Sequence, residues 1–294
     1  MSVELPTTPP PVADREPLAR GARISGPVAI GVDARRFFNL TWTLAITEFK
    51  LRFFGSALGY VWQLMRPLML FGVLYVVFTQ VLKFSSDAEF YPVALLSGIV
   101  MFTFLSESTT TAVTSLVDRE PLVRKVQFPR LVIPLSVATT ALLNLGLNLI
   151  VVIIFLLISG GTVHWGWLEL PLLMLLLTLF GASICTLLSA LYVRYRDIRP
   201  VWDVIMQMLF YATPIFYTLD VINNTTIERL MLVNPLAVII QQFRHAVIDP
   251  SHPSAATAAG SWTFLLIPAG VLLLLVVGAY RYFNREAPLI AEDL

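Results

Sequence analysis

The chain has 294 residues, of which 57% are hydrophobic and 13% charged, and its formal net charge is +1. A typical soluble domain is about 45–50% apolar and about 25% charged. The composition therefore excludes a disordered chain, a coiled coil and a basic nucleic-acid-binding domain. Too few charged residues remain to cover a soluble globule, which indicates an integral membrane protein.

Six segments are long and apolar enough to cross a bilayer, which takes about 20 residues per helix. Polar loops separate them, and none alternates with the period of two that marks a barrel strand. The predicted fold is an all-α integral membrane protein whose spanning helices are residues 60–82, 91–115, 131–158, 169–192, 201–218 and 262–283.

The region before the first span divides into two parts. Six prolines and scattered charges between residues 4 and 27 predict a disordered tail over residues 1–33. Residues 34–56 predict an amphipathic helix that lies in the membrane surface. The alternative is a helix packed against a cytoplasmic partner. The aromatic stripe of the predicted helix consists of Phe38, Trp42, Ala45, Phe49 and Phe53. Its polar stripe consists of Arg36, Asn39, Thr43, Thr47 and Lys50.

Lysine and arginine gather on one side of the predicted spans. With the N-terminus in the cytoplasm, 17 of the 20 basic residues lie on the inner side, and only Lys83, Arg229 and Arg244 lie outside. Cytoplasmic loops of membrane proteins carry an excess of these residues. We therefore expect a multi-pass protein with both termini in the cytoplasm.

Two predicted inner loops are strongly charged. Residues 118–130 (DREPLVRKVQFPR) also carry Leu122, Val123, Val126 and Phe128, and residues 193–200 (VRYRDIRP) are shorter. A solvated loop has no need of apolar side chains, whereas a short helix would offer them to a cytosolic partner. The alternative is a pair of charged loops that contact only lipid headgroups.

The longest outer segment is residues 218–261. Its apolar stretch, residues 227–248, is interrupted by Asn234-Pro235 and also contains Arg244. Because a charge at the bilayer centre costs about 2.5–3.5 kcal/mol, the stretch does not predict a simple span. It predicts two short helices that enter from outside and return, or, alternatively, two helices that rest on the outer surface.

The second predicted span contains the candidates for a polar pathway. Thr103, Glu107, Thr110 and Thr114 lie on one helical face, and ionisable residues inside a membrane are functional candidates by default. The alternative is that the hydroxyls bond to their own helix and that Glu107 is protonated or paired.

Aromatic residues on two spans are candidates for the same pathway. Phe71, Tyr75 and Phe78 form a stripe on the first span, and Phe210 and Tyr211 lie on the fifth. Aromatic faces stack on sugar rings, so these side chains predict a channel for a glycan. Packing between helices or contact with lipid is the alternative.

No catalytic motif is present in the sequence. It lacks the phosphate loop G-x-x-x-x-G-K-[ST], the nucleophile motif G-x-S-x-G and the zinc motif H-E-x-x-H. Cys185 is the single cysteine, and no cysteines and histidines have the spacing of metal ligands. We therefore expect a chain that is not an enzyme and binds no metal.

Four stretches, in this order, resemble the permease subunit of a type-2 ABC exporter, most closely the polysaccharide-exporting branch that moves O-antigens, teichoic acids and related lipid-linked glycans. They are residues 49–68 with Leu58, Gly59, Trp62 and Pro67; residues 123–135 with Lys125, Val126, Phe128, Pro129 and Arg130; residues 191–217 with Arg194, Tyr195, Arg196 and Asp197; and residues 234–244 with Asn234, Pro235, Leu236 and Arg244.

The resemblance implies a permease of the bacterial inner or plasma membrane that exports a lipid-linked polysaccharide through a channel between two identical protomers. Two copies of a separate cytoplasmic ABC ATPase would bind ATP and Mg²⁺, and this chain would hold no cofactor. Residues 34–56 would be the interface helix, residues 57–285 the six-helix domain and residues 286–294 a cytoplasmic tail.

The resemblance also implies three groups of functional residues. Contacts with the ATPase would come from Asp118, Arg119, Glu120, Leu122, Lys125, Val126, Phe128, Arg196 and Asp197. The translocation path would be lined by Phe71, Tyr75, Phe78, Thr103, Glu107, Thr110, Phe210 and Tyr211. The outer gate would contain Asn234, Pro235 and Arg244.

Three other functions stay open at this point. The main alternative is a type-2 ABC permease for a drug or a small lipid. A membrane transferase would need acids or histidines clustered near one membrane face, which the sequence does not show. A proton-coupled carrier would need a carboxylate relay, for which only Glu107 and Asp203 are candidates.

Overall fold

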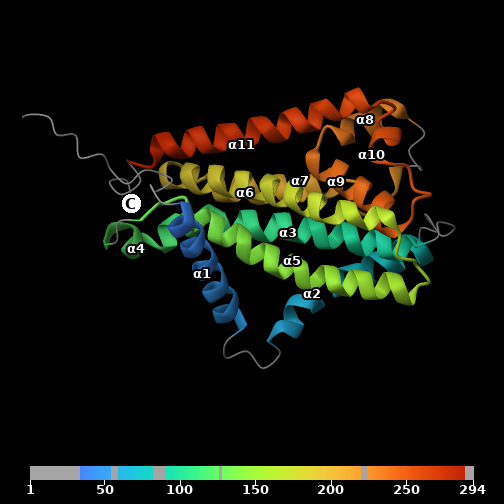
Figure 1. Ribbon diagram of the computed structural model, residues 1–294, viewed down its shortest axis with the longest axis horizontal. Coiled ribbons are helices and arrows are strands. Elements are labelled where there is room, and N and C mark those ends of the chain that lie inside the picture. Colours follow the sequence, from blue (N-terminus) through green and yellow to red (C-terminus); the bar gives the residue numbers. More distant parts are fainter. Residues whose placement is uncertain (1–33, 54–58, 82–89, 126–127, 220–223, 289–294) are drawn as a thin grey trace, which may run out of the picture.

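The computed structural model describes residues 34–53, 59–81, 90–125, 128–219 and 224–288, and its regular elements within these ranges are all helical (Figure 1). The predicted all-α class is confirmed. The predicted tail over residues 1–33 and residues 289–294 lie outside the described residues. The elements in chain order are α1 (Ala34–Phe53), α2 (Tyr60–Val76), η1 (Val77–Val81), α3 (Tyr91–Asp118), α4 (Glu120–Lys125), α5 (Val132–Ile158), η2 (Trp165–Glu169), α6 (Leu170–Arg194), α7 (Ile198–Ala212), α8 (Thr225–Leu232), α9 (Pro235–Phe243), η4 (Arg244–Ile248), α10 (Ala255–Ala258), η5 (Trp262–Leu265) and α11 (Leu266–Glu286).

Five helical segments in the described part of the chain are long and apolar enough to cross a membrane. They agree with five of the six predicted spans, with ends that differ by a few residues. The segments are Val61–Val81, Tyr91–Asp118, Val132–Ile158, Trp165–Arg194 and Trp262–Glu286.

The bounds of the predicted span over residues 201–218 are wrong, because the helix there is shorter and is followed by non-helical chain. Helix α7 begins earlier, at Ile198, and ends at Ala212. Pro214 disfavours a helical conformation for the residue before it, and Thr213 is extended with φ −94° and ψ 139°. Residues 213–218 therefore continue as non-helical chain after a short helix.

The segment interrupted at Asn234-Pro235 forms a sharply bent pair of helices, as the sequence predicted, and its entry into the membrane from outside stays a prediction. Thr225–Leu232 and Pro235–Ile248 meet at 104°. Asn234 ends the first helix and starts the second, because its side chain accepts a hydrogen bond from the amide of Leu236 and Pro235 occupies the first helical turn. Helix α9 is mostly buried against α6, α11 and α3, whereas α8 is mostly exposed.

Helix α3 is the centre of the bundle. It packs most extensively on α5 and α6, and Figure 1 shows it running between them. Small residues make this close packing possible, as is usual between membrane helices. The buried small residues of α3 include Ser97, Gly98, Ser108, Ala112 and Ser115.

The bundle has two distinct ends. The α4 end carries α1, α4, the connection between α6 and α7 and the last described residues, and the α8 end carries α8, α9 and α10 (Figure 1). Helix α1 packs on α5, with Ala45 fully buried. Phe38 and Trp42 point away from the chain, being 74% and 49% exposed. The predicted polar stripe is exposed, but the predicted apolar stripe is divided, because Ala45 packs inward while Phe38 and Trp42 face outward. The place of α1 in a membrane surface stays a prediction.

Candidate functional site

A cavity of about 690 Å³ opens between α2, α3 and α7. Its wall mixes polar and charged side chains with apolar and aromatic ones. Gln63, Arg66, Thr103, Ser106, Glu107, Thr110, Thr111, Asp203 and Gln207 form the polar part, and Pro67, Leu70, Phe102, Met206, Phe210 and Tyr211 the apolar part. Such a wall suits a ligand that has both hydroxyl groups and apolar faces.

Five of the eight predicted path residues line this cavity. Thr103, Glu107 and Thr110 come from α3, and Phe210 and Tyr211 come from α7. The helical spacing of the α3 residues, four and three apart, places them on the one face that meets the cavity. Thr103 also donates a hydrogen bond to the carbonyl of Ile99 at 2.7 Å, so the alternative of bonding to its own helix applies to its hydroxyl as well.

Glu107 is the centre of a polar hub that joins four helices. It forms an ion pair with Arg52 at the end of α1. It also accepts hydrogen bonds from Gln63 of α2 and Asn144 of α5, each at 3.0 Å. A second cavity of about 350 Å³, which Arg66 and Trp62 also line, adjoins the hub. The predicted alternative that Glu107 is paired is therefore correct, and the residue still borders both cavities.

The aromatic stripe on the first span lies in packing contacts. Phe71 stacks on Tyr75 with a centroid distance of 5.7 Å and meets Phe155 of α5 edge-on at 5.8 Å. Phe78 meets Phe216 at 5.0 Å. None of the three stripe residues is among the residues that line the larger cavity. Their role in a path stays a prediction.

The apolar residues of the charged loop between α3 and α5 partly serve the fold itself. Val123 of α4 is 5% exposed, and both it and Phe128 pack in a small core. That core also contains Phe283, near the end of α11. Leu122 is half-buried, and Glu120 starts α4. Val126 lies outside the described residues, and for Lys125 only its position in α4 is described.

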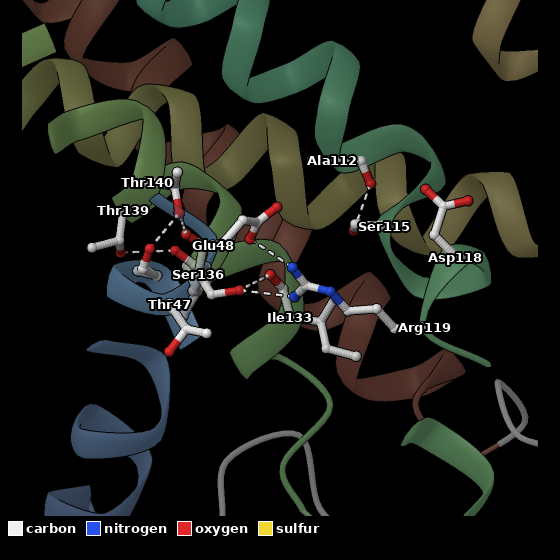
Figure 2. A network of polar contacts seen from close by, with 12 residues as sticks. Thr47, Glu48, Ala112, Ser115, Asp118, Arg119, Ile133, Ser136, Thr139 and Thr140 are labelled. Carbon is white, nitrogen blue, oxygen red and sulfur yellow. Dashed lines mark hydrogen bonds and ion pairs between the residues drawn. The ribbon is translucent and has the colours of Figure 1, made fainter. Parts of the chain in front are cut away.

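Arg119 turns inward and does not extend from the loop into solvent. Figure 2 shows its guanidinium reaching from the end of α3 toward α1 and α5. It forms an ion pair with Glu48 at 2.6 Å and donates a hydrogen bond to the hydroxyl of Ser136 at 3.1 Å. Because these two contacts occupy its side chain, Arg119 joins α1 to the bundle beside the loop.

Other charged residues at the α4 end fall into an exposed group and a buried one. The exposed residues are Asp118, Arg196 and Asp197. Asp118 accepts a hydrogen bond from Thr114 at 2.7 Å. The guanidinium of Arg196 lies 5.1 Å from the ring centre of Tyr192. Arg130 is buried and donates to the carbonyl of Ala287 just after α11. Burial lowers the pKa of its guanidinium.

The predicted gate residues meet at the α8 end. Asn234 donates a hydrogen bond to the hydroxyl of Thr213 at 3.1 Å. Arg244 is 1% exposed, and it donates to the carbonyls of Ile215 at 2.9 Å and Tyr217 at 3.2 Å. These contacts connect the bent helix pair to the non-helical chain that follows α7.

Comparison with known proteins identifies the family. The family model for ABC-2 type transporters matches residues 39–248. The chain belongs to the ABC-2 type transporter family. The match contains both cavities, α4 and the bent helix pair, so the features described above belong to the part that defines this ABC-2 permease.

Curated relatives match nearly the whole ABC-2 chain. It is 26% identical over 260 residues to an O-antigen export system permease protein RfbA of Myxococcus xanthus, covering 88% of this chain and 96% of the relative. It is 28% identical over 259 residues to an O-antigen export system permease protein RfbA of Klebsiella pneumoniae, covering 87% of this chain and 95% of the relative.

Sequence reasoning missed part of the site in this ABC-2 permease. Arg52, Gln63 and Asn144 surround Glu107, and none was singled out as a site residue. One signal for Asn144 was available: it lies four residues from Asn148 in a predominantly apolar helix, where amides need partners. Nothing in the sequence pattern indicates that Arg52 pairs with a residue 55 positions away.

Proposed function

We propose that this chain is the membrane permease half of an ATP-driven exporter of a lipid-linked polysaccharide. The observation that carries the proposal is the cavity between α2, α3 and α7, in a chain whose matched relatives are named O-antigen export permeases. Phe210 and Tyr211 offer ring faces to sugars, and Gln63, Asp203 and Gln207 offer hydrogen bonds to hydroxyls.

Two copies of the chain form the path in this proposal. The span made by α2 and η1 has only 6% of its apolar stretch buried, although it forms one wall of the cavity. Helix α7 also has exposed apolar side chains on the face that points away from the bundle, among them Val204 and Met208. A second copy placed against these helices closes the open side of each cavity and buries both apolar surfaces.

The energy for export enters at the α4 end. Helix α4 and the connection between α6 and α7 lie at the same end of the bundle (Figure 1). That connection contains the exposed residues Arg196 and Asp197. Helix α4 and this connection form the surface that a cytoplasmic ABC ATPase contacts in this proposal. Arg119 and Arg130 transmit movement from this surface, since they fasten the loop between α3 and α5 to α1 and to the end of α11.

Reconstitution with a cognate ABC ATPase tests this function. Vesicles that contain both proteins should transfer a labelled, polyprenyl-linked polysaccharide when ATP is present, and should stop with a hydrolysis-dead ATPase. Collapse of the proton gradient should leave transfer unchanged, which separates the exporter from a proton-coupled carrier. ATP hydrolysis that responds to drugs or small lipids, and not to the polysaccharide, would contradict the proposal and support the alternative ABC-2 function.

The ATPase contact has its own test. Leu122→Ala combined with Arg196→Ala should reduce the amount of ATPase that co-purifies with the permease, because both side chains lie at the α4 end and neither is fully buried. Arg281→Ala, at an exposed position of α11, is the matched control. Equal co-purification with the double variant and the control would refute the contact.

A further inference from the structure

The non-helical chain after α7, residues 213–218, is here called the strap. Pro214 ends α7, so the carbonyl groups of the strap have lost the partners that a continuing helix would supply. Ile215 is fully buried, and Thr213 is too. Non-helical backbone at membrane depth is tolerated only where protein or water satisfies its polar groups.

Side chains from two other elements satisfy three consecutive carbonyls of the strap. Arg244 of η4 donates to Ile215 at 2.9 Å and to Tyr217 at 3.2 Å. Tyr91, at the start of α3, donates its hydroxyl to the carbonyl between them, that of Phe216, at 2.8 Å. The strap is thus held in place by side-chain hydrogen bonds and not by the backbone hydrogen bonds of a helix.

The strap also lies against the backbone of α3 at Gly98. A Cβ atom on Gly98 would stand 3.1 Å from the carbonyl oxygen of Ile215 and 3.3 Å from its Cα. These distances are tighter than ordinary van der Waals contact. Glycine at this position therefore allows the strap to approach α3 closely enough for Tyr91 to reach it.

This anchoring places Phe216 beside Phe210, a residue that lines the larger cavity. Phe102 and Phe210, which line the cavity, meet with a centroid distance of 5.1 Å. The ring of Phe216 lies 6.0 Å from Phe210 and 5.0 Å from Phe78 of η1. A continuous series of rings therefore crosses from α3 and α7 to the span that contains α2.

We propose that the strap closes the cavity at its α8 end, and that Arg244 and Tyr91 are the positioning residues that hold Phe216 across it. This inference rests on the proposed function of the cavity as a transport path. Opening takes place when the strap carbonyls leave Arg244 and Tyr91, which withdraws Phe216 from Phe78 and Phe210. Helices α3 and α6 stay in place during this step.

Thiol labelling tests the closure without any substrate or ATP. Thr103→Cys places a reporter in the cavity, and a membrane-impermeant maleimide is added on the side of the α8 end. Cys185 is fully buried, so the parent chain gives the background. Tyr91→Phe and Arg244→Lys should each accelerate labelling by about twofold to tenfold, the effect of losing a hydrogen bond of ordinary strength. Tyr280→Phe and Arg281→Lys on α11 are the matched controls, and they should leave the rate unchanged.

Labelling rates that equal the parent rate in folded Tyr91→Phe and Arg244→Lys proteins would overturn the proposal. If Arg244→Lys does not fold, Tyr91→Phe decides, because it keeps the ring and removes only the hydroxyl. This readout does not depend on what is exported, so its failure is distinct from failure of the proposed function.

A cross-link tests whether the closure must open during export. Phe78→Cys combined with Phe216→Cys places two thiols where the native rings are 5.0 Å apart. A short bifunctional thiol reagent that can be cleaved by reductant should stop ATP-driven export in reconstituted vesicles, and reduction should restore it. Each single-cysteine variant, treated in the same way, is the control. Normal export by the cross-linked protein would overturn the proposal.

Discussion

Helices α2 and α3 are neighbours with similar apolar content and opposite surroundings. The mean hydropathy of their apolar stretches is 1.6 for the span of α2 and η1 and 1.4 for α3. The buried share of these stretches is 6% for the first and 78% for the second. Hydropathy therefore identifies both as membrane helices and does not tell which one is the core of the protomer.

Small residues on the packed faces of α3 contribute to this difference. Buried small residues such as Gly98 and Ser108 let neighbouring helices approach α3 closely. Helix α2 instead presents large exposed side chains, including Met65, Met69 and Val73. Helix α3 therefore supports the protomer, and α2 offers a surface that lipid or a second copy can cover.

The largest expected effect comes from removing a core side chain of α3. Leu105 is fully buried, whereas Leu70 of α2 is 40% exposed. Leu105→Ala should lower the free energy of unfolding by about 2–5 kcal/mol because it leaves a cavity in a packed core. Leu70→Ala, the matched control, should have a much smaller effect. Thermal unfolding in detergent measures the stability of both variants. Equal losses of stability would contradict the distinction between the two helices.

The second prediction concerns the hub that ties α2 to α3. Glu107→Ala should lower the free energy of unfolding by about 1–3 kcal/mol, because Arg52, Gln63 and Asn144 lose the acceptor that they share. Glu107→Gln keeps an acceptor and should recover part of the loss. The matched control is Glu228→Gln on exposed α8. Thermal stability of Glu107→Ala equal to that of the unsubstituted chain would show that the hub does not hold the helices together.

The third prediction uses one glycine from each helix. A Cβ atom on Gly98 would press on the backbone of Ile215, whereas one on Gly72 of α2 would meet nothing within 4 Å. Gly98→Ala should therefore destabilise the chain by about 1–3 kcal/mol through overpacking. Gly72→Ala should be neutral or stabilising by up to about 1 kcal/mol, since alanine favours a helix. If both substitutions change the melting temperature in the same direction, that result would contradict the packing described for α3.

Much of the architecture could be predicted from periodicity and composition. Five of the spans and the break at Asn234-Pro235 follow from apolar runs and from the conformational limits of proline. The polar face of α3 was also recognisable, because Thr103, Glu107 and Thr110 repeat at helical spacing in an apolar segment. Local patterns of this kind show which face of a helix carries the polar residues.

Contacts between residues that lie far apart in the sequence could not be predicted in this way. Arg119 was assigned to a cytoplasmic loop as a contact for the ATPase, and its side chain bonds to Glu48 and Ser136, which belong to other helices. Apolar content extended the fifth predicted span through Pro214, although the restriction that proline places on the preceding residue was visible in the sequence. The ring contact between Phe78 and Phe216 depends on this break in the helix. Because the prediction was an unbroken helix, the strap was not predicted either.

Cysteine cross-linking between copies tests most directly the claim that α2 faces a second copy across the transport path. Single cysteines at exposed α2 positions 65, 69, 73 and 76 are compared with one at Leu274 of α11, which is 75% exposed. Cys185 is fully buried and cannot contribute to the links. In native membranes we expect oxidation to link two chains through cysteines on the α2 face, and to leave the Leu274→Cys chains single. Links through α11 with none through α2 would contradict the account.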